Sequence, residues 1–167
     1  MSVSRITDKN YEDFMGSRRA VLVLSESWCP ACHAYKPIVE ALSGSMPYVR
    51  FGEAVLDEGH LIKLKRSYPA EEVEYLPTTV LFRDGKVVYK FEGGYDESDL
   101  HDTVRENLIV GSIVYVPGED GLHVPRVIRK VNGDKYTLQL PSPFDEVRTV
   151  EMTESQFAWN MPRQLLA

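Results

Sequence analysis

Cysteine is scarce in this sequence: only two of its 167 residues are Cys, and they lie three positions apart. A secreted scaffold held together by disulfides would carry more cysteines at wider spacing. Long apolar runs are missing as well, since no stretch approaches the roughly 20 residues that a membrane helix needs. We therefore expect a soluble globular protein that does not act at a membrane.

Positive charge is also in short supply, because 19 Lys and Arg face 25 Asp and Glu, giving a formal net charge of -6. Nucleic-acid binding depends on clustered Lys and Arg, and no such cluster stands out, so we expect no nucleic-acid partner. Residues 1–9 are polar and lack the apolar segment of a signal peptide. Together with the low cysteine content, this predicts a cytoplasmic protein.

The sequence pattern predicts an α/β domain over residues 1–109. Apolar runs and alternating patterns predict strands at 20–24, 48–56, 79–82 and 86–91. Helical spacing predicts helices at 11–15, 33–46, 60–68 and 96–108. Asp84-Gly85 signals a hairpin turn, and Asp96 or Ser98 is expected to cap the last helix.

The predicted helix at 33–46 carries regularly spaced apolar residues, which we expect to form its buried face: Ala34, Ile38, Ala41 and Leu42. Pro37 lies inside this helix and predicts a kink there. After residue 110 the pattern changes to short alternating strands separated by turn clusters, at 112–116, 124–131, 135–140 and 147–152. Residues 110–167 are therefore predicted to form a second, small all-β module.

The residues that carry chemistry are Cys29-Pro30-Ala31-Cys32. A thiol at a helix start feels the positive end of the helix dipole and unpaired amide donors, which favour the thiolate and lower the thiol pKa. Pro30 suits the first helical position, where no amide donor is needed. We expect Cys29, at an exposed helix tip, to attack a substrate disulfide, and the more buried Cys32 to resolve the mixed disulfide.

The cysteine pair has three other interpretations. The two cysteines could be buried and inert, or they could bind zinc, which needs two further thiol or imidazole ligands. The other candidate ligands are scattered along the chain: His33, His60, His101 and His123. Cys32-His33 also completes a haem-attachment pattern, which requires export. The helix-start setting favours redox chemistry, so we expect no metal and no cofactor.

These features together resemble the thioredoxin family over residues 1–109. The resemblance rests on Trp28 before the pair, on Pro37, and on the later segments Leu76-Pro77-Thr78-Thr79, Phe82-Arg83-Asp84-Gly85-Lys86 and Gly93-Gly94. It implies an α/β fold with a mixed central sheet flanked by helices. It also implies a thiol–disulfide oxidoreductase, a protein-disulfide reductase that acts on protein disulfides and takes electrons from a reductase or another thiol donor.

The resemblance also implies roles for single residues. Cys29 would be the nucleophile and Cys32 the resolving thiol. A cis Leu76–Pro77 bond would turn the backbone of Leu76 outward to pair with an extended substrate. The implied substrate-binding residues are Trp28, Pro30, Leu76 and Pro77.

Two departures from the family pattern bear on the chemistry. The dipeptide between the cysteines is Pro-Ala instead of the common Gly-Pro, which leaves the direction of electron flow open. Typical members keep a buried Asp six residues before the first cysteine, which helps to deprotonate the resolving thiol, and here that residue is Val23. We hypothesise that Glu26 or His33 partly substitutes, although His33 is equally interpretable as a solvated helix residue.

The segments that characterise residues 110–167 are Gly111-Ser112-Ile113-Val114-Tyr115, Pro125-Arg126-Val127-Ile128 and Tyr136-Thr137-Leu138. They resemble a small SH3-like barrel, for which the Tudor type is one candidate. Tudor readers bind methylated side chains in an aromatic cage, and the aromatic residues here are Tyr115, Tyr136, Phe144, Phe157 and Trp159. Core filling is the simpler interpretation for Tyr115 and Tyr136. This second module suggests an alternative function for the whole chain. In that alternative the protein serves in binding or targeting, the first domain is an interaction scaffold, and the barrel recruits the partner.

Overall fold

The computed structural model describes residues 3–58, 61, 64, 73–117, 121–132, 135–139 and 149–153. The chain divides into two compact units, Met1–His101 and Asp102–Ala167, which are described separately below. This division falls inside a helix, and the domain limits expected from the sequence, 1–109 and 110–167, stay a prediction.

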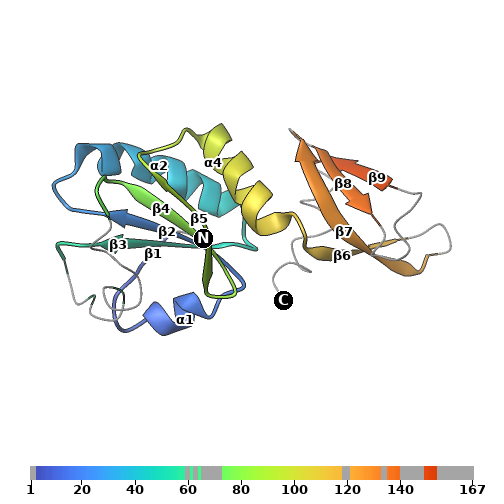
Figure 1. Cartoon of the computed structure of the whole chain (residues 1–167), viewed down its shortest axis with the longest axis horizontal. Coiled ribbons are helices and arrows are strands. Elements are labelled where there is room, and N and C mark those ends of the chain that lie inside the picture. The colour runs from blue at the N-terminus through green and yellow to red at the C-terminus, as the bar shows by residue number, and fades with distance from the viewer. Residues whose placement is uncertain are drawn as a thin grey trace. The chain divides into compact units, whose positions relative to one another are not determined.

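The first unit contains a five-stranded mixed sheet. Its elements are β1 (Ser4–Arg5), α1 (Tyr11–Met15), β2 (Arg19–Ser25), α2 (Pro30–Ser45), β3 (Arg50–Val55), β4 (Thr78–Arg83), β5 (Lys86–Glu92) and α4 (Glu97–Val104). The strand order is β1-β3-β2-β4-β5, with β2 parallel to β3 and antiparallel to β4. Helices α2 and α4 lie on one side of the sheet and α1 on the other (Figure 1). The mixed sheet flanked by helices is thereby confirmed.

Most elements of this unit match the sequence prediction, with a few differences. The strand β1 was missed, and it pairs in parallel with β3. The predicted hairpin turn is confirmed, because Asp84 and Gly85 have positive φ angles of 51° and 78°, as a type I′ turn requires. Asp96 caps α4 by accepting a 2.8 Å hydrogen bond from the Asp99 amide. The predicted helix at 60–68 lies outside the described residues, apart from the buried Leu61 and Leu64.

The buried face of α2 differs from the prediction. The helix buries Cys32, Tyr35, Val39, Leu42 and Ser43, whereas Ala34 and Ala41 are exposed and Ile38 is only half-buried. The helical period was right, but the phase was wrong except at Leu42. The buried positions continue at intervals of three and four from Cys32, so the cysteine that turns toward the sheet sets the phase of the whole helix.

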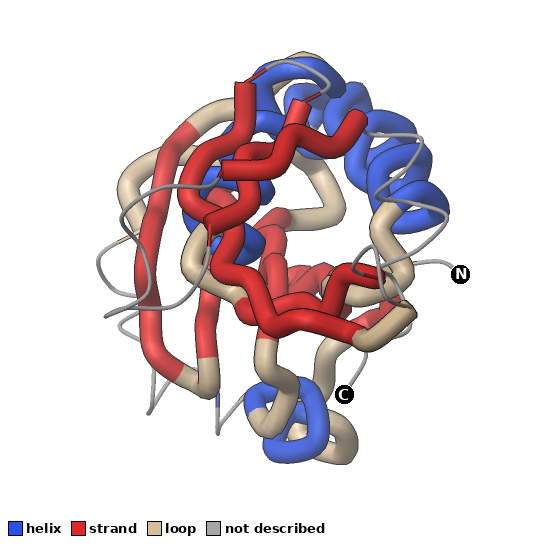
Figure 2. The backbone as a smooth tube through the Cα atoms, turned by 90° about the vertical axis from the view of Figure 1, so that its right-hand side faces the viewer, coloured by secondary structure: helices blue, strands red, loops and turns tan. Residues whose placement is uncertain are grey.

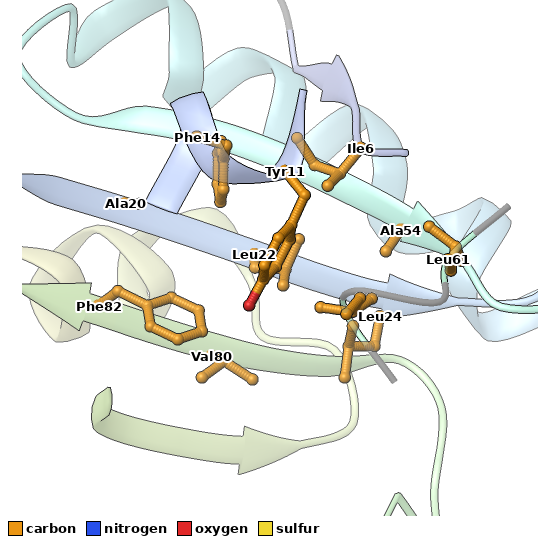
Figure 3. Close-up of a cluster of buried hydrophobic side chains, with 11 residues drawn as sticks. Ile6, Tyr11, Phe14, Ala20, Leu22, Leu24, Ala54, Leu61, Val80 and Phe82 are labelled. Atoms are coloured by element: carbon orange, nitrogen blue, oxygen red, sulfur yellow. The ribbon is translucent and has the colours of Figure 1, made fainter. Parts of the chain in front are cut away.

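The side of the sheet that faces α1 holds a continuous apolar core, shown in Figure 3. It is formed by Ile6, Tyr11, Phe14, Ala20, Leu22, Leu24, Ala54, Leu61, Leu64, Val80 and Phe82. Gly52 lets β3 approach this core closely, since a Cβ atom there would lie 2.7 Å from an Ile6 carbon and 2.8 Å from a Phe14 carbon. Because side chains alternate along a strand, the residues between these core positions face α2 instead.

The second unit begins with the end of α4, which continues as a π-helical turn, η2 (Arg105–Ile109). Four antiparallel strands follow in sheet order: β6 (Ile113–Pro117), β7 (His123–Asn132), β8 (Lys135–Gln139) and β9 (Thr149–Thr153). They form a curled half-barrel, and Figure 2 shows its strands bending as they cross. A β-sheet module is thus confirmed for the described residues after 110, whereas its likeness to a Tudor-type barrel stays a prediction.

A buried arginine attaches η2 to this sheet. The side chain of Arg105 is 3% exposed and donates a 2.6 Å hydrogen bond to Asp102, while its guanidinium lies 5.5 Å from the centre of the Tyr136 ring. Tyr136 is fully buried, so core filling is confirmed there, but it is wrong for Tyr115, which is 51% exposed. The other aromatic candidates, Phe144, Phe157 and Trp159, lie outside the described residues.

Candidate active site

The two cysteines lie at the start of α2, just after the loop that follows β2. Cys29 is the N-cap of α2, Pro30 is its first residue, and the Cys29 Sγ atom accepts a 3.2 Å hydrogen bond from the Cys32 amide. A disulfide joins Cys29 and Cys32, whose Cα atoms are 5.3 Å apart. The helix-start setting and the pairing predicted from the sequence are both confirmed.

The exposure expected for the two sulfurs is not found. Cys29 is 4% exposed and Cys32 is 6% exposed, so the prediction of an exposed first and a more buried second cysteine is wrong for this oxidised form. The physical reason is that each sulfur in a disulfide covers the other, which removes the difference that the separate thiols would show.

Hydrogen bonds hold the loop that precedes Cys29. The Ser27 hydroxyl and amide both donate to the Asp57 carboxylate, with an amide distance of 2.9 Å. These hydrogen bonds from Ser27 hold the pKa of Asp57 below its usual value. The Ser27 carbonyl lies 2.7 Å from the His33 Nε2 atom, and the Trp28 indole N–H donates to Glu26. Trp28 is therefore presented to solvent on an anchored loop, and its side chain is 67% exposed.

The Leu76–Pro77 segment lies at the same end of the sheet as the cysteine pair. Its peptide bond is cis, as the resemblance implied. Leu24 pairs with Thr78 in the β2–β4 register, so β2 ends where β4 begins. The buried Pro77 and the loop that leads to Cys29 therefore share one end of the sheet. The Pro77 carbonyl accepts a 2.7 Å hydrogen bond from the Gly93 amide, which fixes this segment from the β5 side.

Tyr35 links α2 to strand β4 through a hydrogen bond. The sequence analysis did not predict this contact. Its hydroxyl shares a 3.0 Å hydrogen bond with the Thr79 hydroxyl, and the tyrosine is 2% exposed. Burial raises the pKa of Tyr35 to about 12. Gly94 leaves room for the ring, because a Cβ atom there would lie 3.1 Å from a Tyr35 ring carbon. The i, i+3 spacing from Cys32 to Tyr35 was the sequence signal that could have revealed this contact.

Two cavities open beneath Cys32. The smaller, of about 10 Å³, is lined by Val3, Val23, Cys32, Tyr35, Lys36, Val39 and Glu53. The larger, of about 120 Å³, is lined by Arg5, Ser25, Glu26, Ser27, Cys32, His33, Lys36, Glu53, Val55 and Glu58. The hypothesised Glu26 and His33 therefore reach the surroundings of Cys32, but so does Glu53, which the sequence analysis missed because β3 lies far along the chain.

The structure places the predicted site residues as follows. The disulfide pair and Pro30 form the start of α2, and Trp28 extends into solvent. The Leu76–Pro77 segment lies at the same end of the sheet. Among the described residues, no three His, Cys, Asp or Glu side chains gather in an arrangement that could hold a metal ion. None of the helices in the described ranges is long and apolar enough to cross a membrane.

Comparison with known proteins matches residues 2–106 to the family described as Thioredoxin. The chain is 31% identical over 107 residues to a thioredoxin of Chlamydia pneumoniae, covering 63% of this chain and 98% of that protein. It is 25% identical to a thioredoxin of Staphylococcus saprophyticus, covering 65% of this chain and all of that protein.

Solved structures show the same likeness. A Fasciola hepatica thioredoxin superposes with a TM-score of 0.53 at 27% identity, covering 63% of this chain and 99% of that chain. A mutant thioredoxin from Halobacterium salinarum has a TM-score of 0.55 at 23% identity, covering 64% of this chain and 91% of that chain. The family match ends at residue 106, before the first strand of the half-barrel.

Proposed function

The chain belongs to the thioredoxin family, and from this premise we propose that it reduces disulfides in proteins through Cys29 and Cys32. The observation that carries the proposal is the disulfide at the start of α2, where the Cys29 sulfur accepts the Cys32 amide hydrogen bond. A helix N-terminus favours a thiolate at this point. A redox cysteine pair in a thioredoxin homologue is consistent with a disulfide reductase.

The reaction proceeds in two exchanges. The Cys29 thiolate attacks one sulfur of a protein disulfide, which forms a mixed disulfide and releases the second substrate sulfur as a thiolate that takes up a proton. Cys32 then loses its proton and attacks the Cys29 sulfur, so that the bond from Cys29 to the substrate breaks. Two electrons have passed to the substrate, and Cys29 and Cys32 are left joined as in this structure.

The substrate-binding surface of this proposal consists of Trp28, Pro30, Leu76 and Pro77. Trp28 is 67% exposed, Pro30 is exposed and Leu76 is half-buried, so these side chains can contact a partner. Pro77 is buried, and its part is to shape the backbone that would pair with an extended peptide. Family membership implies protein disulfide substrates and a reductase partner in general.

Reduction of insulin disulfides by dithiothreitol tests this proposal. We expect the chain to accelerate the reaction and Cys29→Ser to abolish the acceleration, because the nucleophilic sulfur is gone. Trp28→Ala is expected to raise KM for insulin more than it lowers kcat. If the wild-type chain gives no acceleration over dithiothreitol alone, the reductase proposal is wrong, and a protein-binding role for the first domain becomes the better account.

A trapping experiment identifies the physiological substrates. Cys32→Ser should hold substrate proteins on Cys29 as mixed disulfides, because the resolving thiol is missing. The matched control is the Cys29→Ser, Cys32→Ser double variant, which should trap nothing. Mass spectrometry of the trapped proteins would name the substrates, and cell fractionation would test the cytoplasmic location that the sequence predicts. A Cys32→Ser variant that holds no more protein than the double variant would contradict the proposed exchange.

A further inference from the structure

A carboxylate lies beneath the resolving cysteine on a strand that the motif does not include. Glu53 belongs to β3, and the β2–β3 register pairs it with Val23. The neighbouring Ala54 and Leu24 belong to the core on the α1 side. Because side chains alternate across a strand, Val23 and Glu53 point to the opposite side, where α2 carries Cys32.

The cavities beneath α2 agree with this placement. Cys32 and Glu53 line both of them, so the two side chains face the same space from the helix and from the sheet. The larger cavity, of about 120 Å³, has room for a few water molecules at roughly 30 Å³ each, and its charged lining supplies their hydrogen-bond partners. A proton can therefore pass between the Cys32 sulfur and the Glu53 carboxylate through water.

We propose that Glu53 is the proton acceptor of the resolving thiol, an inference that rests on the proposed reductase function. The Cys32 thiol gives its proton to Glu53 through water in the cavity, and the resulting thiolate attacks the Cys29 sulfur of the mixed disulfide. The bond from Cys29 to the substrate breaks, and its electron pair leaves on the substrate sulfur. That sulfur is then protonated from solvent, while the Glu53 proton returns to water.

Glu53 fits this role better than the two residues suggested by the sequence. The Glu26 carboxylate accepts the Trp28 indole N–H, and the His33 Nε2 atom is bonded to the Ser27 carbonyl, so both have a contact on the loop that presents Trp28. The side chain of Glu53 is only 15% exposed and lies on the side of the sheet that faces α2.

The ion pairs around Glu53 also leave its carboxylate available. Arg5 lies 3.0 Å from the Glu58 carboxylate but 4.0 Å from the Glu53 carboxylate. The guanidinium is therefore bound mainly to Glu58, which is 51% exposed, and only weakly to Glu53. Lys36, from α2, is a second cation among the described residues that line both cavities with Glu53.

The test measures the two exchanges separately over a range of pH. Stopped-flow mixing of the reduced chain with a protein disulfide gives the rate of mixed-disulfide formation on Cys29 and then the rate of its resolution by Cys32. In Glu53→Gln we expect resolution to slow on the order of 10²-fold at neutral pH and formation to keep its wild-type rate. The defect should shrink at alkaline pH, where hydroxide deprotonates Cys32 without help.

Matched variants separate Glu53 from the other titratable groups that face it. These are Arg5 from β1, Lys36 and His33 from α2, and Glu26 and Glu58 from the loops. Glu53→Asp, which keeps a carboxylate, should recover part of the resolution rate and so distinguish proton transfer from altered packing. Glu40→Gln removes an exposed carboxylate of α2 that lines neither cavity, and this variant should resolve at the wild-type rate.

The outcomes are distinguishable from failure of the proposed function. If the wild-type chain reduces disulfides and Glu53→Gln resolves the mixed disulfide at the wild-type rate at every pH, the role of Glu53 is refuted while the reductase function stands. Loss of the pH dependence in Glu26→Gln or His33→Ala, with Glu53→Gln unchanged, would assign the proton to those residues. A defect in Glu53→Asp equal to that of Glu53→Gln would also overturn the proposal, because it would show that shape and not charge is needed.

Discussion

Replacing Tyr35 with Phe should remove a pH-dependent contribution to stability near the disulfide. The pKa of Tyr35 is raised by burial to about 12, whereas its ordinary value is 10.0. Below pH 10 the folded and unfolded chains both hold the proton, so the contribution is fully present. Between pH 10 and 12 the unfolded chain releases the proton first, and the free energy of unfolding therefore falls as the pH rises.

The size of the effect follows from the two pKa values. A difference of about two pKa units corresponds to about 3 kcal/mol, and roughly half of it is lost by pH 11. At neutral pH, Tyr35→Phe should cost about 1 kcal/mol, because the hydrogen bond with the Thr79 hydroxyl is lost. The stability gap between wild type and variant should therefore close, and then reverse, as the pH rises from 9 through roughly 11.

Equilibrium urea unfolding of the two oxidised proteins over this pH range measures the gap directly. The comparison cancels the titration of the other eight tyrosines to first order, since all nine Tyr of the chain are shared except the one replaced. A gap that stays constant within about 0.5 kcal/mol from pH 9 to 11 would show that Tyr35 titrates like an exposed tyrosine, and would refute the burial argument.

Three further predictions concern the frame of the site. Gly52→Ala should lower the free energy of unfolding by about 1–3 kcal/mol in urea titrations, because the added methyl overpacks the core on the α1 side; an unchanged midpoint would contradict this. Gly93→Ala places a side chain at φ +82° and should lower the free energy of unfolding by about 1–2 kcal/mol. The change should also disturb the hydrogen bond from the Gly93 amide to the Pro77 carbonyl and so raise KM in insulin reduction. A shift in kcat alone would argue against this prediction. Asp57→Asn should lower the free energy of unfolding at neutral pH, because the hydrogen bonds from Ser27 hold the pKa of the Asp57 carboxylate low. In unfolding titrations this deficit should vanish as the pH falls below the ordinary Asp pKa of about 3.9. A deficit that persists in acid would show that the charge is not its cause.

The local parts of the site could be predicted from the sequence because they depend on neighbouring residues. A cysteine followed by proline after a buried strand is enough to predict a helix start, and the structure has Cys29 as the N-cap and Pro30 as the first helical residue. The same holds for the Asp84-Gly85 turn, where the two residue types favour the positive φ angles that the structure has. The cis bond before Pro77 followed from the family resemblance and not from local physics.

Features that depend on distant pairing could not be predicted in the same way. The short β1 strand has no apolar pattern of its own and exists because its backbone pairs with β3. The buried face of α2 was misassigned because the predicted apolar set did not include Tyr35, whose hydroxyl has a buried partner in Thr79. In both cases the deciding contact is made by a residue from another element, which periodicity within one segment does not reveal.

The substitution of Val23 for an acidic residue shows why such contacts decide function. The space beneath Cys32 is bounded by two adjacent strands, and the register makes Val23 of β2 and Glu53 of β3 neighbours across it. A carboxylate can reach this space from either strand, so the loss of an acid on one does not by itself remove proton transfer. A search near the motif finds Glu26 and His33, because they are close in sequence, yet both make their contacts with the loop before Cys29. The strand register, which no short motif encodes, therefore determines which carboxylate can serve the resolving thiol.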